Sequence, residues 1–331
     1  MSVFTTLMAL AVGIFLGCRY HFANKVQPRR FTADWPGRDE GGALYCTGDT
    51  VIAVRTGSED DSRTVVAFPG FLEDMRYFQA LYQDFTGQLI LVNNADYHNP
   101  FDGDITPLVD WSANPYPLGT IEHDGFVLAQ VVQQLASGTQ VTVHGHSRGG
   151  AVTLEAARQF PAVMRPEERA VSAILEAAVL PQARTVGPTS RPLGFTIARW
   201  IFPLVMTLLR KAPPERILEN PMMRPTNPLK TALCQSIFFT PRRYATAVTN
   251  FVSIRRWQAE HTAVLFNGYA HIDVVIGEKD HVLDNPTMTA SAEQGAEQNA
   301  GLNIVHTQQT NHFVSLEQPA IIRALVDSAK P

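Results

Sequence analysis

The sequence predicts an α/β fold in which helices cover both faces of a mostly parallel sheet. Short apolar runs of β character alternate with helical stretches along most of the chain. A Gly-X-Ser-X-Gly turn joins one of these runs to a helix of small residues. The 331 residues are enough to bury a full core. Because strands separated by helices pair in parallel, such a sheet needs cover on both faces.

The expected elements follow from hydrophobic period and from turn residues. Strands are expected at 44–55, 63–69, 89–93, 140–144, 171–175, 271–276 and 302–305. Helical patterns lie at 71–85, 120–136, 150–157 and 316–329. Residues 94–117 are rich in Asn, Asp and Pro, which predicts a long loop.

The N-terminus is expected to be a hydrophobic anchor over residues 1–22, followed by a juxtamembrane linker over 23–43. Residues 3–18 carry no charge, and neither a basic start nor a small-residue cleavage site marks them as a secretory signal. Arg19, Lys25, Arg29 and Arg30 follow the apolar segment. The positive-inside rule then favours a cytoplasmic position for the rest of the chain, although one short segment leaves the membrane side open.

Residues 181–262 interrupt the strand–helix rhythm and are expected to form a helical cap. The core would then comprise 44–180 and 263–331. The cap region contains the strongly apolar stretch 195–209. Against three acidic residues it carries twelve basic ones, a formal charge of +9 that leaves −13 for the remainder: Arg184, Arg191, Arg199, Arg210, Lys211, Arg216, Arg224, Lys230, Arg242, Arg243, Arg255 and Arg256.

Composition excludes several function classes. The net charge of −4 argues against a nucleic-acid-binding protein, which usually carries a basic excess. Cys18, Cys46 and Cys234 are too far apart to predict a disulfide framework or a zinc site. The oligomeric state is left open.

The motif that carries chemistry is Gly145-His146-Ser147-Arg148-Gly149, which lies between the apolar run 140–144 and the helical stretch 150–157. A Gly-X-Ser-X-Gly turn between strand and helix presents the serine hydroxyl above the sheet edge. This predicts a nucleophile elbow with Ser147 as the nucleophile. A serine hydroxyl is a weak nucleophile unless a histidine takes its proton and a carboxylate orients that histidine.

His312 is the expected base because it follows the last β run and precedes the final helix. His306, His146 and His281 are weaker candidates: His306 is expected at a strand end, His146 lies inside the elbow, and His281 neighbours the expected acid.

Asp280 is the expected acid because it lies in the loop just past the strand 271–276. Asp284 and Glu278 are local rivals, and Glu176, which follows the strand 171–175, is a rival from another position. The order Ser147, Asp280, His312 favours Asp280 over a surface carboxylate with no role.

The chain resembles the α/β-hydrolase superfamily over roughly residues 44–330, through its GHSRG elbow, its GEKD turn after a strand and its NHF turn before the last helix. The order serine, acid, histidine is that of the superfamily, whose helical cap commonly inserts between the sixth and seventh strands. The resemblance implies an α/β-hydrolase fold and an acyl-enzyme mechanism that needs no metal or cofactor. It is unspecific for substrate.

The same resemblance implies an oxyanion hole built from the backbone amides of Phe71 and Arg148. The usual His-Gly-X turn is a variant here, since Phe68 and Pro69 precede Gly70. Dehalogenases and epoxide hydrolases of this fold use aspartate as the nucleophile, so Ser147 argues against both activities.

The expected function is that of a serine ester hydrolase of lipase, esterase or phospholipase A type, acting on an acyl ester or lipid at a membrane surface. Anionic headgroups attract basic residues, and an apolar helix face buries at the acyl boundary. The alternatives are a thioesterase or acyltransferase using the same acyl-enzyme, and a hydrolase-like protein that binds without catalysis. In a blander interpretation, the apolar stretch packs over the active site and the arginines are a solvated face.

Overall fold

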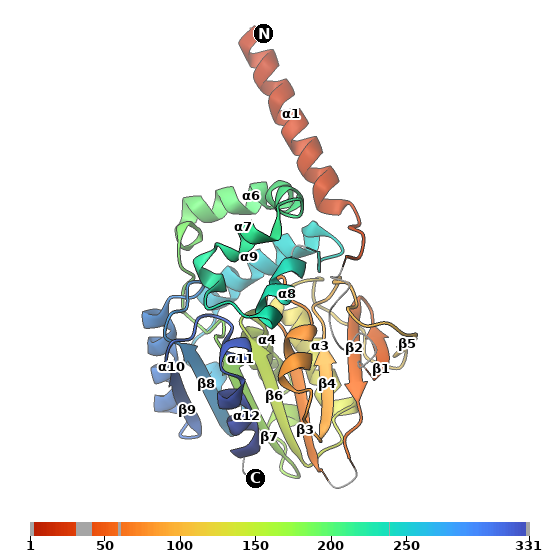
Figure 1. Ribbon diagram of the computed structural model, residues 1–331, viewed down its shortest axis with the longest axis vertical. Coiled ribbons are helices and arrows are strands. Elements are labelled where there is room, and N and C mark those ends of the chain that lie inside the picture. The colour runs from red at the N-terminus through yellow and green to blue at the C-terminus, as the bar shows by residue number, and fades with distance from the viewer. Residues whose placement is uncertain (1–2, 31–41, 59–60, 238, 329–331) are drawn as a thin grey trace.

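A nine-stranded sheet forms the centre of the computed structural model, which describes residues 3–30, 42–58, 61–237 and 239–328 (Figure 1). The strand order is β5-β1-β2-β4-β3-β6-β7-β8-β9. All neighbours from β4 to β9 are parallel, whereas β2 runs antiparallel to β1 and β4. The strands are β1 (Ala43–Thr47), β2 (Thr50–Arg55), β3 (Arg63–Phe68), β4 (Gln88–Val92), β5 (Ile105–Pro107), β6 (Gln140–His146), β7 (Ala170–Glu176), β8 (His271–Gly277) and β9 (Leu302–Thr307).

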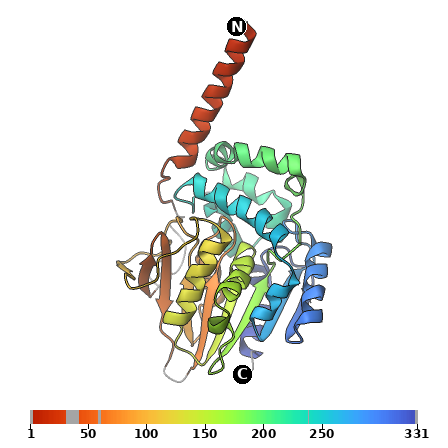
Figure 2. The ribbon, with the colours of Figure 1, turned by 180° about the vertical axis from the view of Figure 1, so that it is seen from behind.

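Helices cover both faces of the sheet, as Figures 1 and 2 show from opposite sides. One face carries α2 (Arg76–Leu81), α11 (Val314–Glu317) and α12 (Pro319–Ser328), and the other carries α3 (Ile121–Gln134), α4 (Arg148–Gln159) and α10 (Asn285–Gln298). In β3, Val66 and Phe68 enter one hydrophobic cluster while Val65 and Ala67 enter the other. This period of two is what a strand buried on both sides requires.

The structure agrees with the α/β-hydrolase fold expected from the sequence, and it differs from the expected elements in four places. The strand expected at 44–55 is an antiparallel pair, β1 and β2, joined by a turn at Gly48 and Asp49. The expected loop 94–117 contains the short edge strand β5, whose three residues are exposed and therefore leave no burial pattern in the sequence. The helical stretch 71–85 is reduced to α2, because residues 69–75 form a loop above the sheet. The C-terminal helix is divided into α11 and α12 at Pro319.

The cap, residues 181–262, lies over the carboxyl ends of the parallel strands (Figure 1). Its described part contains α6 (Pro192–Leu209), α7 (Pro214–Leu218), α8 (Pro228–Ser236) and α9 (Tyr244–Glu260). Helix α9 is tied to the core because the Trp257 indole donates to Glu155 Oε2 of α4 at 3.1 Å. The cap therefore covers the end of the sheet at which the expected nucleophile elbow lies.

Helix α1 (Val3–Asn24) projects from the cap end of the molecule, opposite the C-terminus (Figure 1). It and α6 are long and apolar enough to cross a membrane, judged by length and composition alone. At its base, Arg19 Nε donates to the Trp200 carbonyl at 3.1 Å and its guanidinium lies 4.6 Å from the Trp200 ring centroid.

Residues 25–30, within the expected linker 23–43, lie against the body of the protein. The Gln27 amide donates to the Arg242 carbonyl at 2.8 Å, and the Gln27 carbonyl contacts His98 Nε2 at 2.9 Å. Residues 31–41 of the expected linker lie outside the described part of the chain. The base of α1 is thus held in place by α6 and by residues 25–30.

Candidate active site

Ser147 occupies a strained turn between β6 and α4. Its φ of 51° and ψ of −116° lie in a region that non-glycine residues rarely adopt. The turn is held by hydrogen bonds from Ser147 N to the Glu176 carbonyl (2.9 Å) and from Val179 N to the Ser147 carbonyl (2.8 Å). A Cβ on Gly149 would lie 2.1 Å from the Phe68 carbonyl oxygen, so only glycine fits there. The serine is therefore presented by a turn that its neighbours fully specify.

Asp280 and His312 form a buried pair at the same end of the sheet. His312 Nδ1 donates to Asp280 Oδ2 at 2.9 Å, and Asp280 Oδ1 accepts from the amides of Val282 (2.7 Å) and Leu283 (2.9 Å). Burial alone would raise the pKa of Asp280, but the His312 ring and the two amides outweigh it and lower that pKa. The ionised carboxylate thus fixes the tautomer in which Nδ1 carries the proton and Nε2 can accept one.

The hydroxyl of Ser147 and the ring of His312 are not hydrogen-bonded to each other within the described residues. Nε2 of His312 has no hydrogen-bond partner in the same part of the chain. Catalytic hydrogen bonds often form only once substrate is bound. The structure therefore brings Asp280 and His312 together and leaves the proton-accepting nitrogen available.

Glu176, the rival acid, contacts a different set of groups. It is fully buried at the end of β7 and accepts hydrogen bonds from the Tyr77 hydroxyl (2.6 Å), the Ser315 amide (2.6 Å) and His144 Nε2 (3.0 Å). Burial raises the pKa of Glu176, yet the hydrogen bond from His144, the charges of the His146 and His144 rings and the hydrogen bond from Ser315 bring it down to about 2. Glu176 is therefore a charged anchor between β7 and α11 and does not contact His312.

The other sequence candidates lie outside this pair. Glu278 is exposed and accepts from the Gln309 amide at 2.7 Å, whereas Asp284 caps α10 by accepting from the Thr287 amide at 3.2 Å. His281 and His306 are exposed. Asp280 is thus the carboxylate that reaches His312 among the residues considered from sequence.

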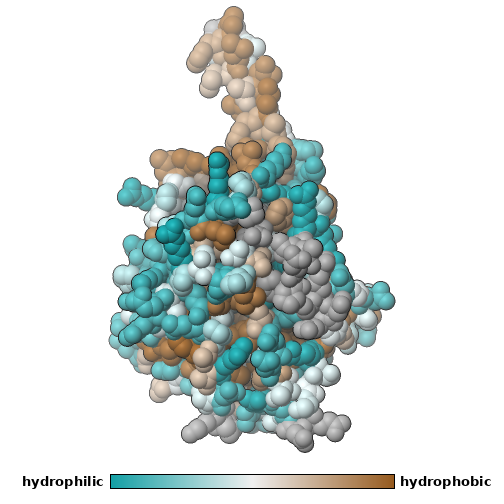
Figure 3. All heavy atoms as spheres, in the orientation of Figure 1, coloured by the Kyte–Doolittle hydropathy of each residue, from teal (hydrophilic) through white to brown (hydrophobic). Residues whose placement is uncertain are grey.

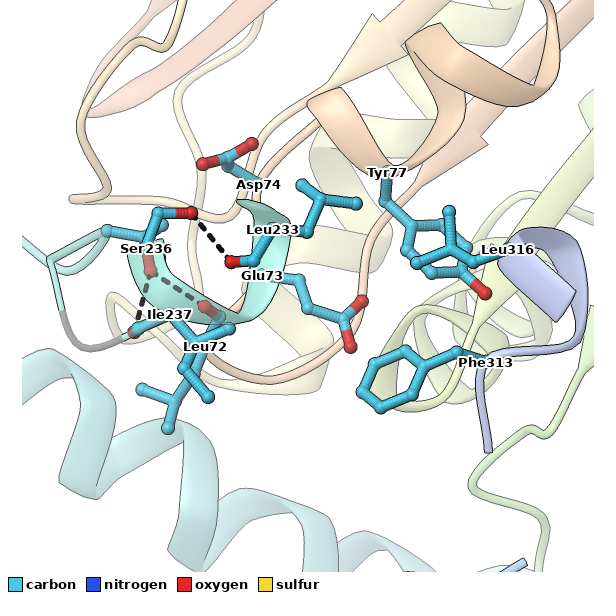
Figure 4. A pocket seen from close by; sticks show the side chains of 10 residues that line it. Leu72, Glu73, Asp74, Tyr77, Leu233, Ser236, Ile237, Phe313 and Leu316 are labelled. Carbon is cyan, nitrogen blue, oxygen red and sulfur yellow. Dashed lines mark hydrogen bonds between the residues drawn. The ribbon is translucent and has the colours of Figure 1, made fainter. Parts of the chain in front are cut away.

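The β3–α2 loop, residues 69–75, lies directly against the elbow. A Cβ on Gly70 would be 2.9 Å from Ser147 Cβ, so glycine allows the loop to approach the serine. Leu72 has a φ of 65°, and its carbonyl accepts from Thr240 Oγ1 of the cap at 2.7 Å. In Figure 4, Leu72 and Glu73 lie beside Ser236 of the cap around a cavity of about 10 Å³. The cap thus holds this loop from above.

A second carboxylate–histidine pair, Glu73 with His146, flanks Ser147 and was missed in the sequence. His146 Nδ1 lies 2.8 Å from Glu73 Oε2, which also accepts from the Gly70 amide at 2.9 Å. His146 Nε2 lies 2.9 Å from the carbonyl oxygen of His312. Because a carboxylate and a carbonyl can only accept, both ring nitrogens must donate, and the ring is an imidazolium.

The electrostatics of His146 agree with that protonation. Burial would lower its pKa, but the charge and hydrogen bond of Glu73 outweigh burial and raise the pKa to about 9. The Tyr77 ring stacks on the imidazole with centroids 4.3 Å apart. The pair therefore ties the β3–α2 loop, the elbow and the His312 loop together. In the sequence, only the position of Glu73 in the loop after the third strand could have pointed to this pair. Its partner His146 is 73 residues away along the chain.

Arg148, expected to contribute its backbone amide, also has a structural side chain. Its buried guanidinium pairs with Asp124 Oδ2 at 2.7 Å and donates to Asn94 Oδ1 at 2.8 Å. Asn94 Nδ2 in turn donates to the Gly70 carbonyl at 2.9 Å. The amide of Arg148 lies at the N-terminus of α4, where the helix dipole favours negative charge. The chain Arg148–Asn94–Gly70 couples the two segments that would supply oxyanion donors.

A cavity of about 870 Å³ opens above Ser147. Phe71 and Ser147 line its floor, and the cap supplies most of the remaining wall. Its volume lies in the range of small-molecule sites. Among the described residues, no three His, Cys, Asp or Glu side chains are grouped so that they could hold a metal ion.

Comparison with known proteins places the chain in a family. The model of the alpha/beta hydrolase family matches residues 13–325. No curated protein gives a significant match. Many solved structures are similar in fold, and three of them serve as examples. A thermophilic esterase from Thermogutta terrifontis with malate bound shares 18% identity at a TM-score of 0.58, over 92% of this chain and 99% of its own.

MenH from S. aureus is 14% identical, with a TM-score of 0.57 over 85% of this chain and 99% of its own. N-acyl homoserine lactonase AidH, complexed with N-butanoyl homoserine, is 14% identical, with a TM-score of 0.51 over 85% of this chain and 93% of its own. At these identities the likeness shows the fold. Esterases and lactonases are both among the similar structures.

Proposed function

The chain belongs to the alpha/beta hydrolase family, and we propose that it is a serine-dependent carboxylic ester hydrolase of lipase, esterase or phospholipase A type, acting through an acyl-enzyme at a membrane surface. One observation carries the proposal: a serine in a strained elbow faces a large cavity, with the buried Asp280–His312 pair at the same end of the sheet. Ser147 is the nucleophile, His312 the base and Asp280 its orienting acid.

The reaction follows from these roles. Ser147 Oγ attacks the ester carbonyl carbon while His312 Nε2 takes the hydroxyl proton. The amides of Phe71 and Arg148 stabilise the oxyanion of the tetrahedral intermediate. When the ester C–O bond breaks, His312 returns the proton to the leaving alcohol. Water, activated by the same nitrogen, then hydrolyses the acyl-enzyme and releases the acid.

The membrane part of the proposal rests on α1 and α6. Helix α1 carries no charged residue from Val3 to Cys18, and α6 exposes a row of large apolar side chains beside the base of α1. Leu193 and Leu208 are 73% and 68% exposed, and Ile197 is 51% exposed. In Figure 3, hydrophobic surface covers α1 and the adjoining top of the body. An exposed row of this kind is typical of a helix that lies in the membrane interface.

The same arrangement places the cavity close to the proposed interface. Phe195 and Phe202 of α6 line the cavity from the inside, while other residues of α6 face outward. A lipid ester leaving the bilayer would therefore need to cross only one helix to reach Ser147. Basic residues of the cap would add about 1 kcal/mol each near an anionic headgroup layer.

The hydrolase part is tested by active-site labelling and turnover. We expect a fluorophosphonate probe to label the wild-type protein and not Ser147→Ala, and 4-nitrophenyl esters of graded chain length to be hydrolysed. Cys46→Ser, a substitution far from the elbow, is the control and should be labelled and active like the wild type. Absence of both labelling and turnover would leave a non-catalytic binding protein as the explanation.

Product analysis separates hydrolysis from transfer to another acceptor. The same acyl-enzyme could pass its acyl group to an alcohol or an amine, and a thioester could replace the ester as donor. Released acid in water, unchanged by added glycerol or alkylamine, supports a hydrolase. Accumulation of the acylated acceptor would instead make the protein an acyltransferase.

The membrane part is tested by separating the two helices. We expect deletion of residues 1–24 to leave a protein that still binds anionic vesicles weakly, and Leu193→Glu with Leu208→Glu in that deletion to abolish the remaining binding. Glu219→Gln, on the outer surface of the cap, serves as a control. A truncated protein that no longer binds vesicles at all would restrict membrane contact to α1.

A further inference from the structure

Two adjacent arginines of α9 have different environments. Arg256 is paired with two carboxylates, Glu122 and Glu260, and lies on the outer side of the helix. Arg255 is half-buried and has no carboxylate within ion-pair distance among the described residues. Its guanidinium lies 4.7 Å from the Phe195 ring centroid, and Nη1 is 3.5 Å from the Arg191 carbonyl oxygen. A positive charge is thus left without an anion at this point.

Arg255 lines the cavity above Ser147, and so does Arg184. The segments that carry them are joined by a hydrogen bond of 2.8 Å from Gln182 N to the Gln258 carbonyl. The backbone of Arg184 is fixed by Thr287, whose Oγ1 accepts from the Arg184 amide at 3.0 Å. No Asp or Glu lines this cavity among the described residues. Its charged wall is therefore cationic only.

A row of phenyl rings connects this cationic wall with the β3–α2 loop. Phe71 stacks against Phe251 with centroids 6.2 Å apart, and Phe251 stacks against Phe195 at 4.7 Å. Phe195 is the ring on which Arg255 lies. From Ser147 outward, the cavity therefore offers an apolar surface first and a guanidinium at its far end.

We propose that the Arg255–Arg184 wall is a binding subsite for an anionic group on the substrate, a carboxylate or a phosphate, separated from the scissile ester by an apolar chain that packs along Phe251 and Phe195. The inference rests on the proposed function in taking Ser147 as the reacting group. Guanidinium groups suit both anions, because their planar fork can bind two oxygens at once. The subsite selects amphipathic acyl esters with a charged end over neutral ones of the same length.

Matched esters test the subsite. The 4-nitrophenyl monoesters of adipic and suberic acid are compared with the neutral 4-nitrophenyl hexanoate and octanoate. A third series with a terminal phosphate distinguishes the two anions. We expect the wild-type enzyme to prefer one charged series and Arg255→Gln to raise its KM by about tenfold to a hundredfold, the size of one charge-assisted hydrogen bond. Because this contact is far from the reacting carbonyl, kcat should change little.

The controls separate a subsite from a general effect of cap charge. Neutral esters should change by less than about twofold in Arg255→Gln, and Arg216→Gln, an exposed cap variant outside the cavity, should behave as wild type with every ester. Arg255→Lys should recover part of the preference. Equal losses for charged and neutral esters, or no preference in the wild type, would overturn the proposal.

Direct binding distinguishes a failed subsite from a failed hydrolase. Monomethyl suberate and methyl octanoate are titrated calorimetrically into Ser147→Ala with and without Arg255→Gln. Tighter binding of the suberate ester that disappears with Arg255→Gln supports the subsite even if wild type hydrolyses no ester. Equal binding of the two esters contradicts it even if the enzyme is active.

Discussion

Two carboxylate–histidine pairs flank Ser147, and they differ in what the second ring nitrogen contacts. In Asp280–His312, Nδ1 is bound by the carboxylate, and Nε2 has no partner among the described residues. In Glu73–His146, Nδ1 meets the carboxylate and Nε2 meets the carbonyl of His312. In the first pair, Nε2 of His312 can still accept a proton. In the second pair, both ring nitrogens of His146 already carry one.

The difference favours His312, and not the histidine adjacent to Ser147 in sequence, as the proposed base. A general base needs a nitrogen that is unprotonated and reachable from the nucleophile. His146 is next to Ser147 but is held as an imidazolium, so it acts as a cationic link between three loops. His312 is 165 positions beyond Ser147, yet of these two rings only that of His312 has a nitrogen without a hydrogen-bond partner among the described residues.

The largest expected effect comes from removing that accepting nitrogen. His312→Ala should lower kcat by about 10⁴- to 10⁶-fold with little change in folding, since other serine hydrolases lose comparable factors with their base. The measurement is kcat with a 4-nitrophenyl ester, alongside circular dichroism. If His312→Ala keeps more than a hundredth of the activity, another group takes the serine proton.

Asp280→Asn should have the next largest effect, about 10⁴-fold in kcat, because an amide no longer fixes the tautomer of His312. Glu176→Gln is the matched comparison, since Glu176 is equally buried but contacts His144 and Ser315. It should lower thermal stability and spare most of the activity. The reverse pattern, with Asp280→Asn active and Glu176→Gln inactive, would assign the acid to β7.

Substitutions in the second pair, Glu73–His146, should lower the stability of the protein more than its activity. Glu73→Ala leaves the buried His146 cation unpaired and the Gly70 amide without its acceptor, so it should cost about 3–5 kcal/mol of unfolding free energy. Glu73→Gln should cost less, because an amide oxygen in the place of Oε2 can still accept from the Gly70 amide and from His146 Nδ1, although it no longer neutralises the cation. Denaturant midpoints measure both variants. Equal losses would show that the charge of the Glu73 side chain matters and its shape does not.

Parts of this arrangement could be predicted from sequence and parts could not. Buried strands such as β3 and β6 are indicated by apolar runs. The elbow is indicated by two glycines, which stand where the turn leaves no room for a side chain. Asp280 and His312 could be predicted because each lies in the loop after a strand, in the expected chain order. Such signals are local, so a single sequence contains them.

The features that were missed depend on contacts between distant segments. The residues near Glu73 in sequence do not indicate that its partner is His146. The residues near Arg255 do not indicate that it lacks a carboxylate partner, whereas Arg256 has two. The exposed strand β5 leaves no periodicity, because neither of its faces is buried. The loop 69–75 resembles the start of a helix in composition, yet its polar groups bond to the elbow and cap instead.

The smallest expected effect is the pH dependence that the second pair confers on stability. The pKa of His146 is about 9 in the folded protein, above its ordinary value of 6.5, so the folded state binds this proton more tightly than the unfolded state. The stabilisation is complete below about pH 6.5 and is lost as the pH rises through 9. Its full size is of the order of 3 kcal/mol.

Glu73→Gln provides the reference for this effect, because it removes the carboxylate charge that does most to raise the pKa of His146 against burial. The difference in unfolding free energy between wild type and Glu73→Gln should favour wild type most at pH 6 and shrink towards pH 9.5. Thermal unfolding at both pH values measures it. A difference that stays constant over this interval would mean that His146 is neutral, and its contact with the His312 carbonyl would then be the only one that requires a proton.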